Sequence, residues 1–204
     1  MERTNDTIAV TGIFSGDDRQ LLGEEFDAFL EGFDGKRQFG LRVNTSKMEL
    51  EEFERIAPFH LRKIPWIPEG YFYDEEDAPA RHPFYAAGLY YLQEPSAMTP
   101  ASRLPVQPGE RVLDLCAAPG GKSFTAAMLM QNAGEIISCD LYEQRVRLIE
   151  SGAQRLGIGI IKPKTANAEI YDETLGKFDL VLCDVPRSGL GVLRRKPEIK
   201  YKGV

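Results

Sequence analysis

The reactive side chains of this sequence gather in the stretch FDLVLCDVPRSGLGV, residues 178–192. Its apolar start has the pattern of a buried strand. Cys183, Asp184 and Arg187 follow this apolar run. A thiol can serve as a nucleophile once ionised, and an arginine suits phosphate oxygens. Because Pro186 cannot continue a central strand, these side chains are expected on a loop. The loop is a reaction site, a binding site or only a turn.

A second polar loop, AAPGGK at residues 117–122, follows a predicted strand and precedes a predicted helix. Glycines let the backbone approach a ligand, and a helix N-terminus offers free N–H groups. Asp140 ends the next predicted strand about 20 residues later, where an acidic residue commonly holds ribose hydroxyls. Neither the G-x-G-x-x-G nor the G-x-x-x-x-G-K-[ST] pattern occurs. A nucleoside-type ligand without pyrophosphate, such as S-adenosylmethionine, therefore fits this loop, and a plain tight turn is the alternative.

These loops belong to a chain segment in which strands and helices alternate. Such alternation indicates a parallel sheet with right-handed crossovers, whose loops after the strands share one edge. The strands are expected over residues 111–115, 135–140, 158–163 and 178–184, and the helices over 123–131 and 142–156.

The first part of the chain predicts a small α+β module instead. Apolar residues at helical spacing indicate a helix over 21–33, and alternation indicates a strand over 39–44, with Phe39, Leu41 and Val43 on one face. Ser46 and Glu49 have the spacing of a capping box ahead of a short helix. Prolines divide residues 58–73 into short strands and loops, and residues 85–98 are expected to form a short helix.

Composition limits the kind of protein further. The formal net charge of −6 makes wholesale coating of nucleic acid improbable, although the basic stretch over residues 187–202 is either a phosphate site or a solvated tail. No apolar run is long enough for a membrane span, and the first residues lack the pattern of a secretory signal. The three cysteines are widely spread, which argues against a disulfide framework and a metal site. A cytoplasmic protein is expected.

The string DLCAAPGGK, residues 114–122, resembles motif I of the S-adenosylmethionine-dependent RNA cytosine-5 methyltransferases of the RsmB/RsmF (Nol/Nop/Sun) type. The resemblance covers roughly residues 21–203. Residues 21–130 look more like the RsmF branch, and GLGVLRRKPEIKYK looks more like the RsmB branch. Other similar stretches are GLRVNT (40–45), PWIPEG (65–70), LQEPSAM (92–98), DVPRSG (184–189) and RRKP (194–197).

The resemblance implies a class I methyltransferase, which is a Rossmann-like α/β fold with strand order 3-2-1-4-5-7-6, here present in part and preceded by the α+β module. It implies formation of 5-methylcytosine in RNA, with ribosomal RNA the expected partner. The implied division is a leader (1–20), an RNA-binding-like α+β module (21–78), a connector (79–108) and an incomplete methyltransferase domain (109–204). The implied cofactor residues are Cys116, Ala117, Ala118, Pro119, Gly120, Gly121, Lys122, Asp140 at the ribose, Asn167 at the adenine and Asp184 beside the target base.

The resemblance also implies two working cysteines that do not appear in this sequence. The position of the product-releasing cysteine is Arg187, and the nucleophile belongs to a Thr-Cys motif on a later strand, beyond Val204. We therefore expect a C-terminally truncated chain without a catalytic residue, inactive alone, in which Cys183 is the least unsuitable substitute. The alternatives are a non-catalytic module that binds S-adenosylmethionine or RNA, and a fragment without function.

Overall fold

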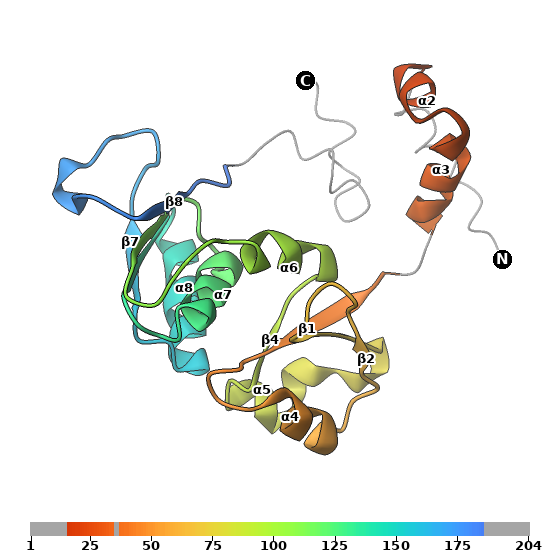
Figure 1. The fold of residues 1–204 in the computed structure, drawn as a ribbon, viewed down its shortest axis with the longest axis horizontal. Helices are drawn as coiled ribbons and strands as arrows, with labels where there is room; N and C mark the ends of the chain where they lie inside the picture. The colour runs from red at the N-terminus through yellow and green to blue at the C-terminus, as the bar shows by residue number, and fades with distance from the viewer. Residues whose placement is uncertain (1–15, 35–36, 186–204) are drawn as a thin grey trace. The chain divides into compact units, whose positions relative to one another are not determined.

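The computed structural model describes residues 16–34 and 37–185 (Figure 1). Arg187 and the basic stretch over 187–202 lie outside the described residues. The chain divides into two compact units, and the described part of the first is a helical segment, whereas the second spans Gln38–Val185.

The helical segment of the first unit contains two helices where one was predicted. Gly23 has a φ of +51°, a value that favours glycine, and it opens a turn of 3-10 helix that interrupts the helix predicted over 21–33. Phe26 is buried, and the Arg19 guanidinium lies 4.8 Å from the centre of its ring. Residues 16–20, which the implied division assigned to the leader, are helical. The elements are α2 (Gly16–Leu22), η1 (Gly23–Glu25) and α3 (Phe26–Asp34).

The second unit begins with a four-stranded antiparallel sheet in the order β2-β3-β1-β4. The central strand β1 pairs with β3 on one side, where Leu41 faces Tyr71, and with β4 on the other, where Leu41 faces Leu92. The strands are β1 (Phe39–Val43), β2 (Arg62–Lys63), β3 (Gly70–Tyr73) and β4 (Tyr90–Leu92). The accompanying helices are α4 (Leu50–Ile56), η2 (Glu75–Asp77), η3 (Pro79–Arg81), α5 (Pro83–Ala86) and α6 (Pro95–Ser102).

Both faces of strand β1 are covered, although only one of them is apolar. Leu41 and Val43 point into a core that includes Phe53 of α4 and Tyr90 of β4, so the predicted alternation is confirmed. Arg42 points to the other face and is only 1% exposed. A guanidinium is rarely buried without partners, so this side of the strand requires polar contacts from its neighbours.

Two local predictions in this region are wrong. The helix expected over 85–98 is replaced by strand β4 and by α6, because Gly88, with a φ of +70°, turns the chain so that Tyr90–Leu92 pair with β1. The capping box of Ser46 and Glu49 does not form, since α4 begins only at Leu50 and the Glu49 side chain makes no capping bond. Instead, the Ser46 N–H donates to the Asn44 side chain, an Asx turn that ends β1.

The rest of the second unit is a four-stranded parallel sheet in the order β7-β6-β5-β8, which confirms the predicted order of the first four strands. The strand predicted over 158–163 lies later, because Gly157 ends the preceding helix with a φ of +73° and a short connection follows. Pro163 is tolerated because β7 is an edge strand among the described residues. The elements are β5 (Arg111–Asp114), α7 (Gly121–Leu129), β6 (Glu135–Asp140), α8 (Glu143–Leu156), β7 (Ile161–Thr165), η4 (Glu173–Leu175) and β8 (Leu180–Leu182).

Helices α7 and α8 pack on the same side of this sheet (Figure 1). Phe124 of α7 and Ile149 of α8 belong to one apolar core with Val112 and Ile136 of the strands.

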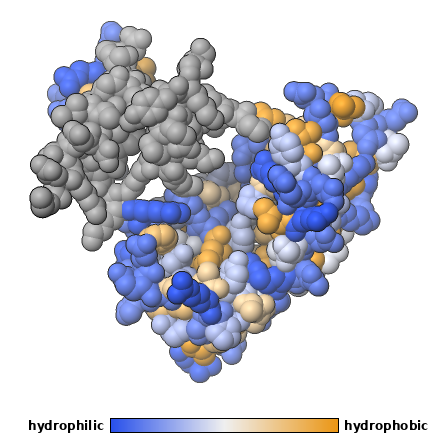
Figure 2. All heavy atoms as spheres, turned by 180° about the vertical axis from the view of Figure 1, so that it is seen from behind, coloured by the Kyte–Doolittle hydropathy of each residue, from blue (hydrophilic) through white to orange (hydrophobic). Residues whose placement is uncertain are grey.

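Strand β8 is the edge of the sheet opposite to β7 among the described residues, and its Val181 is 55% exposed. Hydrophobic residues are interspersed with hydrophilic ones on the face that Figure 2 shows. None of the described helices combines the length and the apolar character that crossing a bilayer demands.

Candidate functional site

The predicted site residues follow the four parallel strands at their carboxyl ends. The loop 116–120 follows β5, Asp140 ends β6, Asn167 lies just beyond β7, and Asp184 lies just beyond β8. Ligands of open α/β sheets bind outside this edge, because the loops leave a crevice there and the helix N-termini point toward it. The topology thus brings residues that are up to 68 positions apart in sequence, such as Cys116 and Asp184, to one edge.

The glycine loop has a geometry that only glycine can supply at Gly120. Its φ is +110°, and a Cβ placed there would lie 2.3 Å from Cζ of Phe124. The Gly120 N–H donates to the Ala117 carbonyl at 2.7 Å, which folds the loop back on itself. The Ala117 N–H donates in turn to the Cys139 carbonyl at 2.8 Å, so the loop is fastened to the end of β6.

Asp140 and the loop are joined by Arg145, a residue that the sequence reasoning missed. Asp140 is 4% exposed, and its Oδ1 accepts a hydrogen bond from the Tyr142 N–H. Arg145 Nη2 lies 3.4 Å from Asp140 Oδ2 and donates to the Ala118 carbonyl at 2.9 Å. The available signal was its place in the first turn of the helix that follows Asp140. Its guanidinium thus bridges the acidic residue and the loop.

The outer residues of the predicted site also lie at this edge. Lys122 Nζ and Asp184 Oδ2 form an ion pair of 2.6 Å, which links the start of α7 to the chain after β8. The Ala166 N–H donates to the Asp140 carbonyl at 3.0 Å, which brings the neighbouring Asn167 next to β6. The Asn167 side chain accepts a bond from the Glu169 N–H and so shapes its own turn. Whether these residues hold a ligand stays a prediction.

Beneath the loop lies a buried chain of hydroxyl groups that ends on a carboxylate. Ser138 Oγ donates to Ser123 Oγ, and Ser123 Oγ donates to Asp114 Oδ2, each at 2.8 Å. Asp114 is 1% exposed, and its Oδ1 is buried without a hydrogen-bond partner among the described residues. Burial raises the pKa of the Asp114 carboxyl, against the lowering effects of the Ser123 hydrogen bond and of the nearby Cys116 backbone N–H. An unpartnered carboxylate oxygen in such a place favours a ligand that carries a hydrogen-bond donor.

The three cysteines differ in what they can do. Cys139 is fully buried, and this burial raises the pKa of its thiol to about 11. Cys116 is partly exposed, and its pKa is also raised, first by burial and then by its neighbour Cys183. Cys183 is exposed and directly precedes Asp184. Within the described ranges no three His, Cys, Asp or Glu side chains gather as a metal site would need.

Comparison with known families gives two matches along the chain. Residues 13–95 match the family described as the N-terminal domain of 16S rRNA methyltransferase RsmF. Residues 101–203, half of the chain, match the family described as 16S rRNA methyltransferase RsmB/F. The first match begins before residue 21, where the resemblance of the sequence motifs begins.

Individual relatives agree with these matches. "Probable ribosomal RNA small subunit methyltransferase B" of Bacillus subtilis (strain 168) is 46% identical over 120 residues, which are 58% of this chain and 27% of that protein. "Ribosomal RNA small subunit methyltransferase F" of Enterobacter sp. (strain 638) is 33% identical over 183 residues, 85% of this chain and 38% of that protein. A crystal structure of a methyltransferase homolog protein from Pyrococcus horikoshii superposes with a TM-score of 0.75 at 31% identity, over 89% of this chain and 60% of that one. This chain thus spans well under half the length of these two sequence relatives.

Proposed function

This chain belongs to the RsmB/RsmF family of 16S rRNA methyltransferases, and from that premise we propose that it binds S-adenosylmethionine for the formation of 5-methylcytosine in ribosomal RNA. One observation carries the proposal. The glycine loop before α7 and the buried Asp140 at the end of β6 lie at the same sheet edge, and Arg145 joins them. This is the arrangement that a nucleoside with a charged tail requires.

The residues present fit S-adenosylmethionine. Loop residues 116–122 would meet the methionine end, and the orphaned Asp114 Oδ1 offers an acceptor for its ammonium group. Asp140 would accept hydrogen bonds from the ribose hydroxyls. Asn167 would face the adenine, where an amide can accept and donate but carries no charge. When bound, the cofactor supplies an electrophilic methyl group on a sulfonium.

Methylation of cytosine at C5 demands a thiolate, since C5 is a poor nucleophile by itself. A thiolate that added to C6 would make C5 enamine-like, so that C5 could take the methyl group as its bond to the sulfonium breaks and a neutral thioether is released. A base would then remove the C5 proton, and the thiolate would leave from C6. The target base must be unstacked to reach the site. Asp184, beside the cofactor loop, is the described residue that would face such a base.

We further propose that this chain alone does not turn over. Burial raises the pKa of both the Cys116 and the Cys139 thiol, which disfavours the thiolate that the reaction needs. Arg187 stands at the position of the releasing cysteine, where its guanidinium would suit an RNA phosphate. These features support a second candidate function, a module that binds cofactor or RNA without catalysis.

Two measurements separate these functions. Isothermal titration of the chain with S-adenosylmethionine is expected to give one binding site per chain, and absence of both binding and a cooperative melt would leave only a non-functional fragment. Transfer of tritiated methyl groups to unmodified ribosomal RNA is expected to stay at the blank. Turnover that Cys183→Ala abolishes would contradict the proposed inactivity and identify Cys183 as the nucleophile.

A further inference from the structure

We propose that Arg42, on the antiparallel sheet, is a positioning residue for the cofactor loop and acts on Gly121 through the hydroxyl of Thr125. The inference rests on the proposed binding of S-adenosylmethionine. It assigns to the antiparallel sheet a role in shaping the cofactor site.

Arg42 makes contacts with two helices that flank the glycine loop region. Its Nη1 donates to Thr125 Oγ1 of α7 at 2.6 Å, and its Nη2 donates to the Met98 carbonyl at 2.9 Å and to Ser102 Oγ at 2.6 Å on α6. Burial lowers the pKa of the guanidinium, and the nearby Glu69 opposes that effect. A planar fork with several donors can serve three acceptors at fixed angles, which a lysine cannot do.

Thr125 passes this contact on to the loop. Its hydroxyl accepts from Arg42 and donates to the Gly121 carbonyl at 3.0 Å. A hydroxyl has one hydrogen, so a donor fixed on its oxygen restricts where that hydrogen can point. Two hydrogen bonds in series therefore join the buried guanidinium to the second loop glycine, and such chains strengthen one another in a buried setting.

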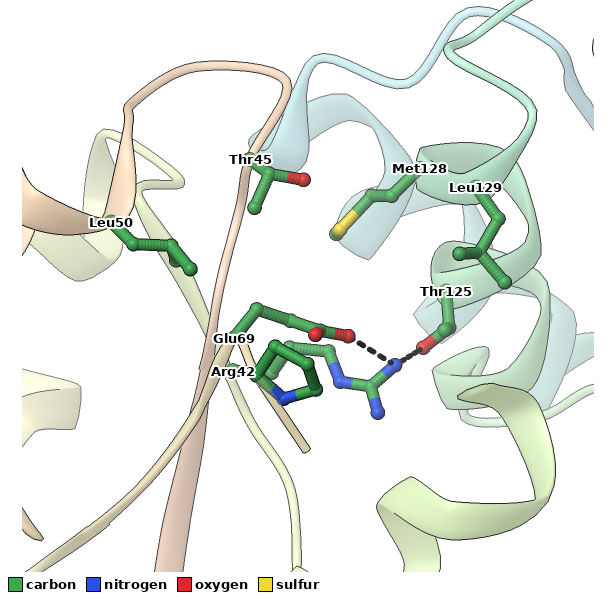
Figure 3. Close-up of a pocket in the computed structure, with 8 residues that line it drawn as sticks. Arg42, Thr45, Leu50, Glu69, Thr125, Met128 and Leu129 are labelled. Carbon is green, nitrogen blue, oxygen red and sulfur yellow. Dashed lines mark hydrogen bonds and ion pairs between the residues drawn. The ribbon is translucent and has the colours of Figure 1, made fainter. Parts of the chain in front are cut away.

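The contact between Arg42 and Thr125 matters because the antiparallel sheet and helix α7 are not close-packed beside it. A cavity of about 270 Å³ lies between them, lined on its apolar side by Leu50, Pro68, Met128 and Leu129 (Figure 3). Figure 3 shows the Arg42 guanidinium between Glu69 and Thr125 at the wall of this cavity. Glu69 Oε1 lies 3.6 Å from Arg42 Nη1. The guanidinium thus joins β1 to α7 at the wall of a void, where side-chain packing contributes little to holding the two elements together.

The first loop glycine is supported from the same sheet by a second route. Tyr91 of β4 meets the Phe124 ring edge to face, with ring centres 5.4 Å apart. The Phe124 ring fills the space in which a side chain at position 120 would lie. Consecutive glycines of the loop are thus each connected to the antiparallel sheet through one residue of α7.

The same junction contains a matched control that does not reach the loop. Asn44 is fully buried, and its Nδ2 donates to the Gly88 carbonyl at 3.0 Å and to the Leu156 carbonyl at 2.9 Å, at the far end of α8. Its loss removes buried hydrogen bonds between the same sheet and a helix. An effect of Arg42 that Asn44 does not share is therefore specific to the loop.

The test uses the full chain with the variants Arg42→Met, Thr125→Val, Thr125→Ser and Asn44→Ala. Amide hydrogen exchange of residues 117–124 is measured without ligand, and the Kd of S-adenosylmethionine is measured by titration. Arg42→Met and Thr125→Val are each expected to speed loop exchange and weaken binding about tenfold, since each removes a charge-assisted hydrogen bond. Thr125→Ser keeps the hydroxyl and is expected to match the wild type in both readouts, and the double variant Arg42→Met/Thr125→Val is expected to be no worse than either single variant.

Equal loop exchange in Arg42→Met and Asn44→Ala would overturn the inference, because it would reduce Arg42 to a general stabiliser. Unchanged affinity in Thr125→Val, which keeps Arg42 and the core volume, would overturn it as well. Absence of cofactor binding in the wild-type chain would instead refute the proposed function. In that case the hydrogen exchange of residues 117–124 would still decide whether Arg42 orders the loop.

Discussion

The two sheets of the second unit differ in how their polar residues are used. The parallel sheet gathers many of them at its carboxyl edge, in loops that follow each strand. Its core is otherwise apolar apart from Thr125 and the Ser138–Ser123–Asp114 chain. The antiparallel sheet buries polar side chains within the sheet itself, as Arg42 shows. The first pattern is a ligand site made by topology, whereas the second is a junction made by specific partners. Substitutions in the two sheets should therefore separate stability from cofactor binding.

The largest effect on stability is expected from Phe53→Ala, in the antiparallel region. Phe53 is fully buried among Leu41, Tyr71 and Tyr90, on the side of β1 opposite Arg42. We expect a loss of about 4 kcal/mol in the free energy of unfolding, measured by urea denaturation, because the cavity left by a phenyl ring does not refill. The Kd of S-adenosylmethionine, measured below the melting range, should not change. A parallel loss of affinity would erase the distinction between the two faces of β1.

The second largest loss of stability is expected from Gly120→Ala, in the region of the parallel sheet. The substitution combines a φ of +110° with a clash against the Phe124 ring, so we expect a cost of about 3 kcal/mol in unfolding and loss of cofactor binding. Gly109→Ala is the control, because its φ of +93° is similar and nothing lies within 4 Å of its Cβ. It should cost about 1 kcal/mol and leave binding intact. Equal costs would mean that backbone strain alone explains the glycine at 120.

Asp140→Asn should change binding more than stability. The amide keeps the shape of the buried side chain but loses the charge that faces Arg145, and we expect S-adenosylmethionine to bind about 2 kcal/mol more weakly. Titration calorimetry measures the change. Asp172→Asn is the matched control. Asp172 also forms an ion pair, with Lys164 of β7, but it comes after Asn167 in the chain and is not one of the predicted site residues. Weaker binding in the control would point to a general charge effect.

The smallest effect concerns pH. The Lys164 and Thr174 hydrogen bonds lower the pKa of the Asp172 carboxyl from its usual 3.8 to about 2. A lowered folded-state pKa means that the contribution is complete above about pH 4 and is lost as the pH falls toward 2. Urea denaturation should therefore show a small difference between the wild type and Asp172→Asn at pH 7 that shrinks at pH 2. A difference that grows on acidification would contradict this sign.

The parallel sheet was predictable because its signals are local. Strand 135–140 was predicted with its observed bounds, since an apolar run between Gly134 and a helix leaves little choice. The order of the strands was predicted from the resemblance to class I methyltransferases, and the structure confirms it for the first four strands. The antiparallel sheet depends on distant partners. β4 is three residues long and pairs with β1 about 50 positions earlier, so no periodicity reveals it.

The site residues also differ in whether local sequence signals reveal them. Asp140 and the glycine loop follow from spacing, and their common edge follows from the parallel order of the strands. Arg145 lies in the first turn of the helix after Asp140, which is a local signal, whereas nothing local marks Arg42. The partners of both arginines depend on which carbonyls and hydroxyls the fold brings to them. The orphaned oxygen of Asp114 likewise becomes visible only when the hydrogen bonds around it are known.

The most direct test is a crystal structure of this chain with S-adenosylhomocysteine. The account predicts that the ligand lies at the carboxyl ends of β5 and β6, with its ribose hydroxyls within hydrogen-bond distance of the Asp140 carboxylate and its amino-acid end at the glycine loop. A ligand found in the cavity beside Arg42, or bound without contact to Asp140, would contradict the account.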